Sequence, residues 1–133
     1  CQKYGFSFVG RSCRIVVRKD FAVWKIDYND WQNQRELACW SEIKDSRFAA
    51  QFTPVFRVCD EVIETEFVEG VLFENLITED CKRAFPFHRE ISIIERDVWN
   101  ELALELHDMK TDNIIITPQN KIKIVDYGMS VCG

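Results

Sequence analysis

The 133-residue chain lacks the patterns that mark zinc-binding, secreted and membrane-spanning proteins. It has two histidines, and none of its six cysteines forms a Cys-x-x-Cys pair, so a zinc site is not expected. No apolar run approaches the ~20 residues of a membrane span, and no secretory signal is visible. Scattered cysteines on apolar patterns favour reduced core residues over disulfides. We therefore expect an intracellular protein in a reducing, cytoplasmic setting, with no membrane partner.

Glycines are few, and acidic residues outnumber basic ones. Seventeen Lys and Arg against 22 Asp and Glu give a net charge of −5, and no basic run is present, which disfavours nucleic acid as a partner. The five glycines and three prolines form no low-complexity tract. In contrast, a hydrophobic fraction of 47% with ten Phe and four Trp is enough for a packed core, and the length suits one domain.

Four polar residues near the C-terminal end have an informative spacing. Asp108, Lys110 and Asn113 fall in one short segment, and Asp126 follows Asn113 after two apolar runs separated by turn residues. Such a pattern predicts a β-hairpin, which brings Asn113 and Asp126 back to one point in space.

The oxygen atoms of Asn113 and Asp126 suit Mg²⁺, a hard cation usually held by few protein groups plus phosphates. Asp108 is then free to act as a base, and Lys110 to offset phosphate charge. Asp112 is better explained as a solvated or turn-stabilising neighbour. The spacing therefore predicts a phosphoryl-transfer site.

The segment 106–113, Leu-His-Asp-Met-Lys-Thr-Asp-Asn, resembles the protein kinase catalytic loop, His-Arg-Asp-Leu-Lys-x-x-Asn, and the segment 126–128, Asp-Tyr-Gly, resembles the kinase Asp-Phe-Gly motif. Leu106 and His107 depart from the motif. Since the motif arginine usually receives an activation-loop phosphate, His107 at its position suggests a kinase that needs no such phosphorylation.

The resemblance implies ATP and Mg²⁺ as cofactors. It assigns Asp108 and Lys110 as catalytic residues, the first accepting the proton of an incoming hydroxyl and the second contacting the γ-phosphate. It assigns Asn113 and Asp126 as the metal ligands.

The alternating run Phe21–Ile26 predicts a strand whose one face carries Val23 and Lys25. It is similar to the third kinase strand, so Lys25 matches the lysine that grips the α- and β-phosphates, and Val23 belongs to the cofactor-binding set. A helix is expected over 31–44, where Glu36 matches the partner of that lysine. A half-buried lysine needs a partner or a phosphate, which is the physical reason for the pair.

The run 65–70, Thr-Glu-Phe-Val-Glu-Gly, is similar to the kinase hinge. Thr65 would be the gatekeeper, and the backbone groups of Glu66 and Val68 would meet the adenine edge.

The phosphate-covering loop is the weakest match. Aligned with Gly-x-Gly-x-x-Gly-x-Val, the chain keeps Gly10 and the valine, Val17, whereas Ser12 and Ile15 replace the other glycines. Because glycines there let the backbone approach phosphate closely, the lid is expected to be stiffer or more distant.

The expected fold class is α+β with a protein kinase-like fold. Residues 1–68 would form an N-lobe of five antiparallel strands plus one helix, and residues 69–133 a much reduced helical C-lobe carrying the catalytic hairpin. The strands are expected at 4–9, 13–18, 21–27, 55–58, 62–67, 114–117 and 122–125, and helices at 31–44, 71–77 and 87–104, the last just after Pro86.

The leading interpretation is an ATP- and Mg²⁺-dependent phosphotransferase, in particular a minimal Ser/Thr protein kinase. A pseudokinase that binds nucleotide or protein and a kinase-fold AMP transferase are the alternatives.

The chain stops five residues after Gly128, so it would lack the substrate-binding half of a typical kinase. Two interpretations suit such a reduced protein. It is either a truncated piece of a larger kinase or a compact viral, phage or bacterial effector that acts on a host protein in the host cytoplasm. A partner chain or a second copy would supply the missing substrate platform.

Overall fold

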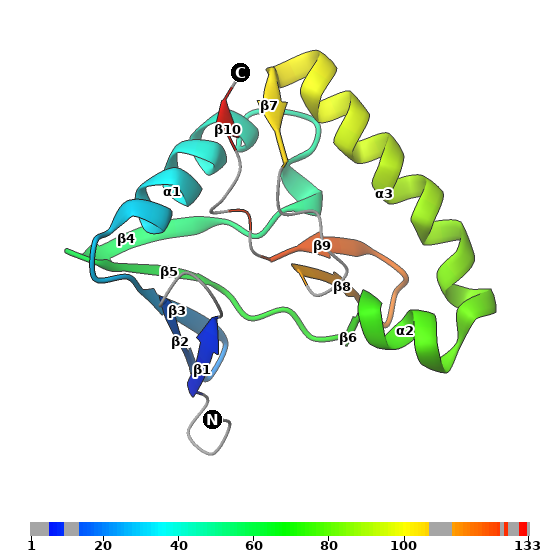
Figure 1. The fold of residues 1–133 in the computed structure, drawn as a ribbon, viewed down its shortest axis with the longest axis horizontal. Helices are drawn as coiled ribbons and strands as arrows, with labels where there is room; N and C mark the ends of the chain where they lie inside the picture. The colour runs from blue at the N-terminus through cyan, green and yellow to red at the C-terminus, as the bar shows by residue number, and fades with distance from the viewer. Residues whose placement is uncertain (1–5, 10–13, 107–112, 126, 128–130, 133) are drawn as a thin grey trace.

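The computed structural model describes residues 6–9, 14–106, 113–125, 127 and 131–132, which form an α+β structure (Figure 1). In the described part, one sheet has five strands in the order β1-β2-β3-β5-β4, one has the order β6-β8-β9, and one consists of β10 and β7. The elements are β1 (Phe6–Val9), β2 (Arg14–Lys19), β3 (Ala22–Ile26), α1 (Trp31–Ile43), the 3₁₀ helix η2 (Ala49–Gln51), β4 (Val55–Cys59), β5 (Val62–Glu66), β6 (Val71–Leu72), α2 (Phe73–Glu79), α3 (Cys81–Leu102), β7 (Leu104–Glu105), β8 (Ile114–Ile116), β9 (Ile122–Ile124) and β10 (Val131–Cys132).

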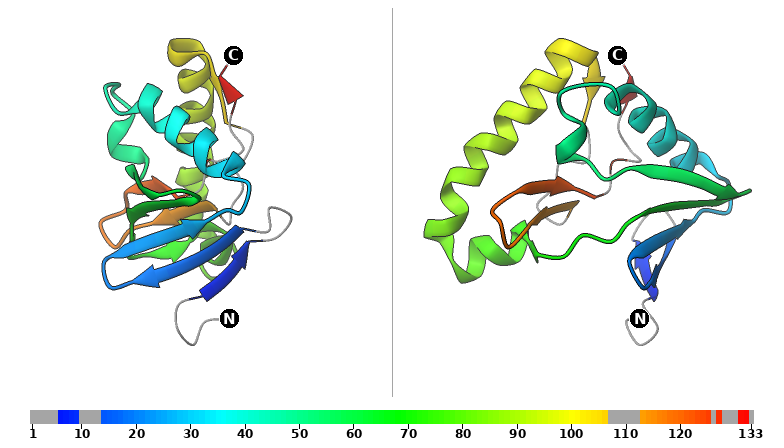
Figure 2. Two further views of the ribbon diagram at one scale, coloured as in Figure 1. Left: turned by 90° about the vertical axis from the view of Figure 1, so that its left-hand side faces the viewer. Right: turned by 180° about the vertical axis from the view of Figure 1, so that it is seen from behind.

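The five-stranded sheet confirms the expected antiparallel arrangement. Lys25 of β3 pairs with Ile63 of β5, and Thr65 of β5 pairs with both Val23 and Val55. Because cross-strand partners share a face of the sheet, these residues form one inner face. Helix α1 lies on that side of the sheet (Figure 2).

Helix α1 buries a more polar face than the sequence pattern predicts. Its buried residues are Gln32, Asn33, Glu36, Cys39 and Ile43. Of the apolar residues that recur at helical spacing, Ile43 is buried, whereas Leu37 and Trp40 are only half-buried and Ala38 beside them is exposed.

Hydrogen bonds explain why polar residues of α1 are buried. The Asn33 side chain donates to the backbone oxygen atoms of Lys25 (3.0 Å) and Glu61 (2.9 Å). At the start of the helix, the backbone N–H of Gln32 donates to a carboxylate oxygen of buried Asp27 (2.8 Å). An acceptor there satisfies an N–H group that the helix itself leaves free.

Helix α3 begins at Cys81, not at Phe87 as expected, and Pro86 therefore lies inside it. Asp80 caps the helix, since its side chain accepts a hydrogen bond from the backbone N–H of Arg83 (3.2 Å). Proline removes one helical hydrogen bond, and the sequence rule that places it at a helix start led to the wrong boundary. The helix ends at Leu102, where Ala103 adopts φ 51°, so Glu105 lies in β7 rather than on the helix.

The hairpin of β8 and β9 lies between the five-stranded sheet and α3 (Figure 1). Its side chains Ile114, Ile116 and Ile124 are each 1% exposed, and each fully buried isoleucine contributes about 1.5–3 kcal/mol. The expected turn at 118–120 is present, with Asn120 at φ 61°, a conformation that asparagine tolerates. The hairpin is therefore part of the core and is held in a fixed place.

Cys39, Cys59 and Cys81 are free thiols. Among the described residues, no helix combines the length and the apolar character that crossing a membrane requires.

Candidate functional site

Lys25 and Glu36 form a buried ion pair between β3 and α1. The Lys25 Nζ atom lies 2.6 Å from a Glu36 carboxylate oxygen, and the two residues are 4% and 0% exposed. The same ammonium donates to the backbone oxygen of Val125 (2.8 Å), which comes directly before Asp126 in the chain. An ammonium has three N–H groups, and these acceptors take two of them. The expected contact between Lys25 and Glu36 is thus present, and Val125 is an additional partner that no sequence pattern indicated.

The hairpin brings Asn113 next to the residue that precedes Asp126. Ile114 pairs with Ile124, and the Val125 N–H donates to the backbone oxygen of Asn113 (3.0 Å). The expected closure of the hairpin is therefore observed up to Val125, within hydrogen-bond reach of Lys25.

Several residues of the predicted site lie outside the described part of the chain. They are the catalytic pair Asp108 and Lys110, the metal ligand Asp126, and the lid residues Gly10 and Ser12. Their roles stay predictions.

The register of β2 against β3 does not bring Val17 to the inner face of the sheet. Val17 pairs with Trp24, whereas Val16 pairs with Lys25. Val23 lies on the inner face with Lys25, as expected, and the β2 residues paired with Lys25 and Val23 are Val16 and Arg18. Successive strand residues point to opposite faces, so Val17 lies with Trp24 on the other face.

Thr65 lies on the inner face, 3% exposed, opposite Val23. Its hydroxyl is buried and has no hydrogen-bond partner among the described residues. Such a group ordinarily has a partner, in the protein, in water or in a ligand. The Glu66 side chain is exposed, and β5 ends at this residue. Beyond it, the Phe67 N–H donates to the backbone oxygen of Phe21 (2.9 Å), and Val68 is buried.

Tyr127 and Thr53 are further residues at this site that sequence reasoning did not find. Tyr127 is 1% exposed, its hydroxyl donates to the backbone oxygen of Thr53, and its ring meets Phe52 edge-on with centroids 5.4 Å apart. Thr53 lies two residues before β4 and is distant from Tyr127 in sequence, so no local pattern pointed to it.

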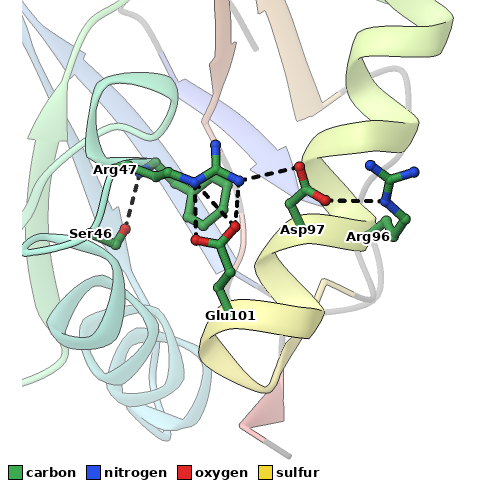
Figure 3. Close-up of polar contacts among 6 residues, drawn as sticks. Ser46, Arg47, Arg96, Asp97 and Glu101 are labelled. Carbon is green, nitrogen blue, oxygen red and sulfur yellow. Dashed lines mark hydrogen bonds and ion pairs between the residues drawn. The ribbon is translucent and has the colours of Figure 1, made fainter.

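A charged cluster joins α3 to the connection between α1 and β4 (Figure 3). Arg47 contacts both carboxylate oxygen atoms of Glu101 and lies 3.3 Å from Asp97, which Arg96 also contacts at 3.1 Å. Hydrogen bonds from Arg96 and then Arg47 lower the pKa of Asp97, and Arg47 lowers the pKa of Glu101. The pKa of Arg47 is raised in return, chiefly by Glu101.

Arg47 and Asp97 also line a surface hollow of about 670 Å³ between η2, α3 and the end of the hairpin. None of the predicted site residues lines it. The hollow is therefore separate from the Lys25 site.

The fold is kinase-like by comparison with solved structures. The complex of Rv3197 with erythromycin from Mycobacterium tuberculosis matches with a TM-score of 0.67 and 14% identity, over 96% of this chain and 46% of that one. WbdD bound to the kinase inhibitor LY294002 matches with a TM-score of 0.63 and 14% identity, over 93% and 32%. A second structure of WbdD, a bifunctional kinase-methyltransferase, gives 0.63 and 14% over 90% and 30%.

The chain spans less than half the length of each of these proteins. No protein-family description matches the sequence, and a search of curated proteins finds no similar sequence. At 14% identity the likeness shows the fold alone.

Proposed function

We propose that this chain is an ATP- and Mg²⁺-dependent phosphotransferase that transfers the γ-phosphate to a hydroxyl group, most specifically a Ser/Thr protein kinase. The observation that carries the proposal is the buried Lys25–Glu36 pair, whose ammonium also contacts Val125, the residue before Asp126. An isolated buried ammonium is costly, and this one is held by a carboxylate and by the backbone oxygen of the residue before Asp126.

The described residues fit a nucleotide bound below the five-stranded sheet. Lys25, steadied by Glu36, would fix the α- and β-phosphates with its remaining N–H group. The Thr65 hydroxyl, which has no hydrogen-bond partner in the described part of the chain, faces the same side as Lys25. It suits a polar ligand such as adenine, next to the backbone groups of Glu66 and Val68.

The metal donors predicted from sequence agree with this placement. Amide and carboxylate oxygen atoms are the ligands that Mg²⁺ prefers, and the hairpin carries Asn113 to Val125. When bound, Mg²⁺ would offset charge on the phosphates. Asp108 would accept the proton of the attacking hydroxyl while the bond from the γ-phosphorus to the bridging oxygen breaks, and Lys110 would offset charge on the transferred group.

The wider organisation is part of the same proposal. Residues 1–68 would be the N-lobe and residues 69–133 a reduced C-lobe. A protein, for example one of a host cell, would be the acceptor, in a cytoplasmic setting. Because the structural neighbours are more than twice as long, the acceptor platform would come from a partner chain, a second copy or further parts of a longer protein.

Radiolabelled ATP tests the reaction. With γ-labelled ATP and Mg²⁺, the wild-type chain should label itself or a protein acceptor, and Asp108→Asn should lower labelling by at least about 100-fold, the usual worth of a positioned base. Asp112→Asn is the matched control, since it removes a neighbouring carboxylate, and it should keep most of the activity.

Equal labelling by wild type and Asp108→Asn would overturn the assignment of the base. Label transferred from α-labelled ATP would instead indicate AMP transfer, and nucleotide binding without any product would indicate a pseudokinase.

A further inference from the structure

Tyr127 carries a buried hydroxyl that the proposed reaction does not use. The ring is packed against Phe52, and the hydroxyl donates to the backbone oxygen of Thr53. A buried phenol hydroxyl needs such a partner. A phenylalanine at this position would make the ring contact but would leave the Thr53 oxygen without this donor.

Thr53 also holds the strand on the other side of Asp126. It is 0% exposed, and its backbone N–H and its hydroxyl both donate to the backbone oxygen of Ile124, each at 3.2 Å. One buried residue therefore binds the chain two positions before Asp126 and one position after it.

Lys25 provides a third contact, to the backbone oxygen of Val125 (2.8 Å). The same ammonium is the group that the proposed function gives to the phosphates. The proposed function gives Thr53 no contact with the phosphates, so its hydrogen bonds to Ile124 and Tyr127 do not depend on the direction of the Lys25 side chain.

We propose that Tyr127 is a positioning residue for the metal ligand predicted at 126: its hydroxyl, hydrogen-bonded to Thr53, ties the main chain at 127 to the segment before β4, and the Mg²⁺ affinity depends on this tie. The inference rests on the proposed function for the metal, whereas the hydrogen bond itself is a feature of the fold. It assigns the Tyr127 hydroxyl a role that the ring alone does not fill.

The test is Tyr127→Phe, with Ile94→Val as the control. Ile94 is 5% exposed on α3 and belongs to none of the predicted site groups. Its variant therefore loses stability and keeps the hydrogen bond between Tyr127 and Thr53. Binding of a non-hydrolysable ATP analogue is titrated with Mg²⁺. Tyr127→Phe should raise the Mg²⁺ concentration for half-saturation roughly three- to tenfold, the usual worth of one hydrogen bond, with the metal-free affinity for the analogue unchanged.

Ile94→Val should match wild type in this titration. A Tyr127→Phe curve that coincides with wild type would overturn the inference and leave the proposed function intact.

Hydrogen exchange distinguishes failure of this inference from failure of the proposed function. In the chain without nucleotide, backbone amides of 122–127 should exchange faster in Tyr127→Phe than in Ile94→Val. Equal exchange in the two variants would show that the Tyr127 hydroxyl does not hold the main chain. A wild-type chain that binds no analogue at any Mg²⁺ concentration would overturn the proposed function and the metal role of Tyr127 together, whatever the exchange shows.

Discussion

Lys25 shows how a single residue connects segments that are far apart in the sequence. Its alternation with Val23 predicted that it lies on an inner strand face, and the kinase resemblance predicted Glu36 as its partner. The Val125 contact had no sequence signal, because a backbone oxygen has no residue type and lies 100 positions away. Sequence reasoning thus found the side chains of the ion pair and missed the main-chain acceptor.

Replacing Lys25 alone should destabilise the fold far more than replacing both Lys25 and Glu36. Lys25→Met leaves the Glu36 carboxylate buried without its counter-charge and should lower the free energy of unfolding by about 3–5 kcal/mol. The double variant Lys25→Met/Glu36→Leu should recover most of that loss, because no buried charge remains. Urea denaturation of the wild type, both single variants and the double variant measures the coupling.

The double variant also separates folding from binding. It should bind no more ATP analogue than Lys25→Met, although it is more stable. Analogue binding restored to the wild-type level would mean that the lysine does not contact the phosphates.

At the scale of elements, the strands were predicted well and the helix boundaries less well. Alternation and turn residues located the hairpin and all five strands of the main sheet within a few residues, because both signals are local. The start of α3 was missed because Asp80, seven residues before Phe87, caps the helix. The polar face of α1 was missed because its partners, Lys25 and Glu61, belong to other parts of the chain. The short strands β7 and β10 exist only through their pairing with each other.

Gly70 fixes how closely the chain between β5 and β6 passes the hairpin. It has φ 156°, and an added Cβ atom would lie 2.4 Å from the backbone oxygen of Ile116 and 2.8 Å from the Ile115 side chain. Gly70→Ala should therefore cost about 1–3 kcal/mol of stability, measured by urea denaturation. A loss within about 0.5 kcal/mol would show that the hairpin and this connection can move apart.

The charged cluster around Arg47 should give a salt- and pH-dependent contribution. The pKa values of Asp97 and Glu101 are lowered in the folded state, so their contribution is present above the ordinary carboxyl pKa of about 4 and is lost as pH falls through the folded-state values. Arg47→Gln should lower the melting temperature slightly at pH 7 in low salt, and the difference should shrink at high salt and near pH 3. Melting curves over pH and salt measure this.

A difference in melting temperature between wild type and Arg47→Gln that stays the same at pH 3 would contradict this electrostatic explanation. It would mean that the guanidinium contributes mainly by packing over the Phe48 ring, 4.3 Å from its centroid.

For the whole molecule, the account depends on segments distant in sequence meeting around one nucleotide. The five-stranded sheet with α1 supplies Lys25 and Glu36, and the hairpin supplies Asn113 and the chain that leads to Asp126. The spacing predicted that Asn113 and Asp126 come together, and the kinase resemblance implied that Lys25 joins them. The structure brings Lys25 and Val125 within 2.8 Å. What the sequence could not predict is the buried link through Thr53 that connects the hairpin to the segment before β4, because it depends on main-chain atoms.

Isothermal titration of the wild-type chain with a non-hydrolysable ATP analogue, with and without Mg²⁺, tests the central claim most directly. We predict one Mg²⁺-dependent site with a dissociation constant within about 1 µM to 1 mM, the range usual for enzyme substrates. Lys25→Met should weaken it at least about tenfold, and Asp126→Asn should remove the dependence on Mg²⁺. No measurable binding by the folded wild-type chain, or equal binding by wild type and Lys25→Met, would contradict the account.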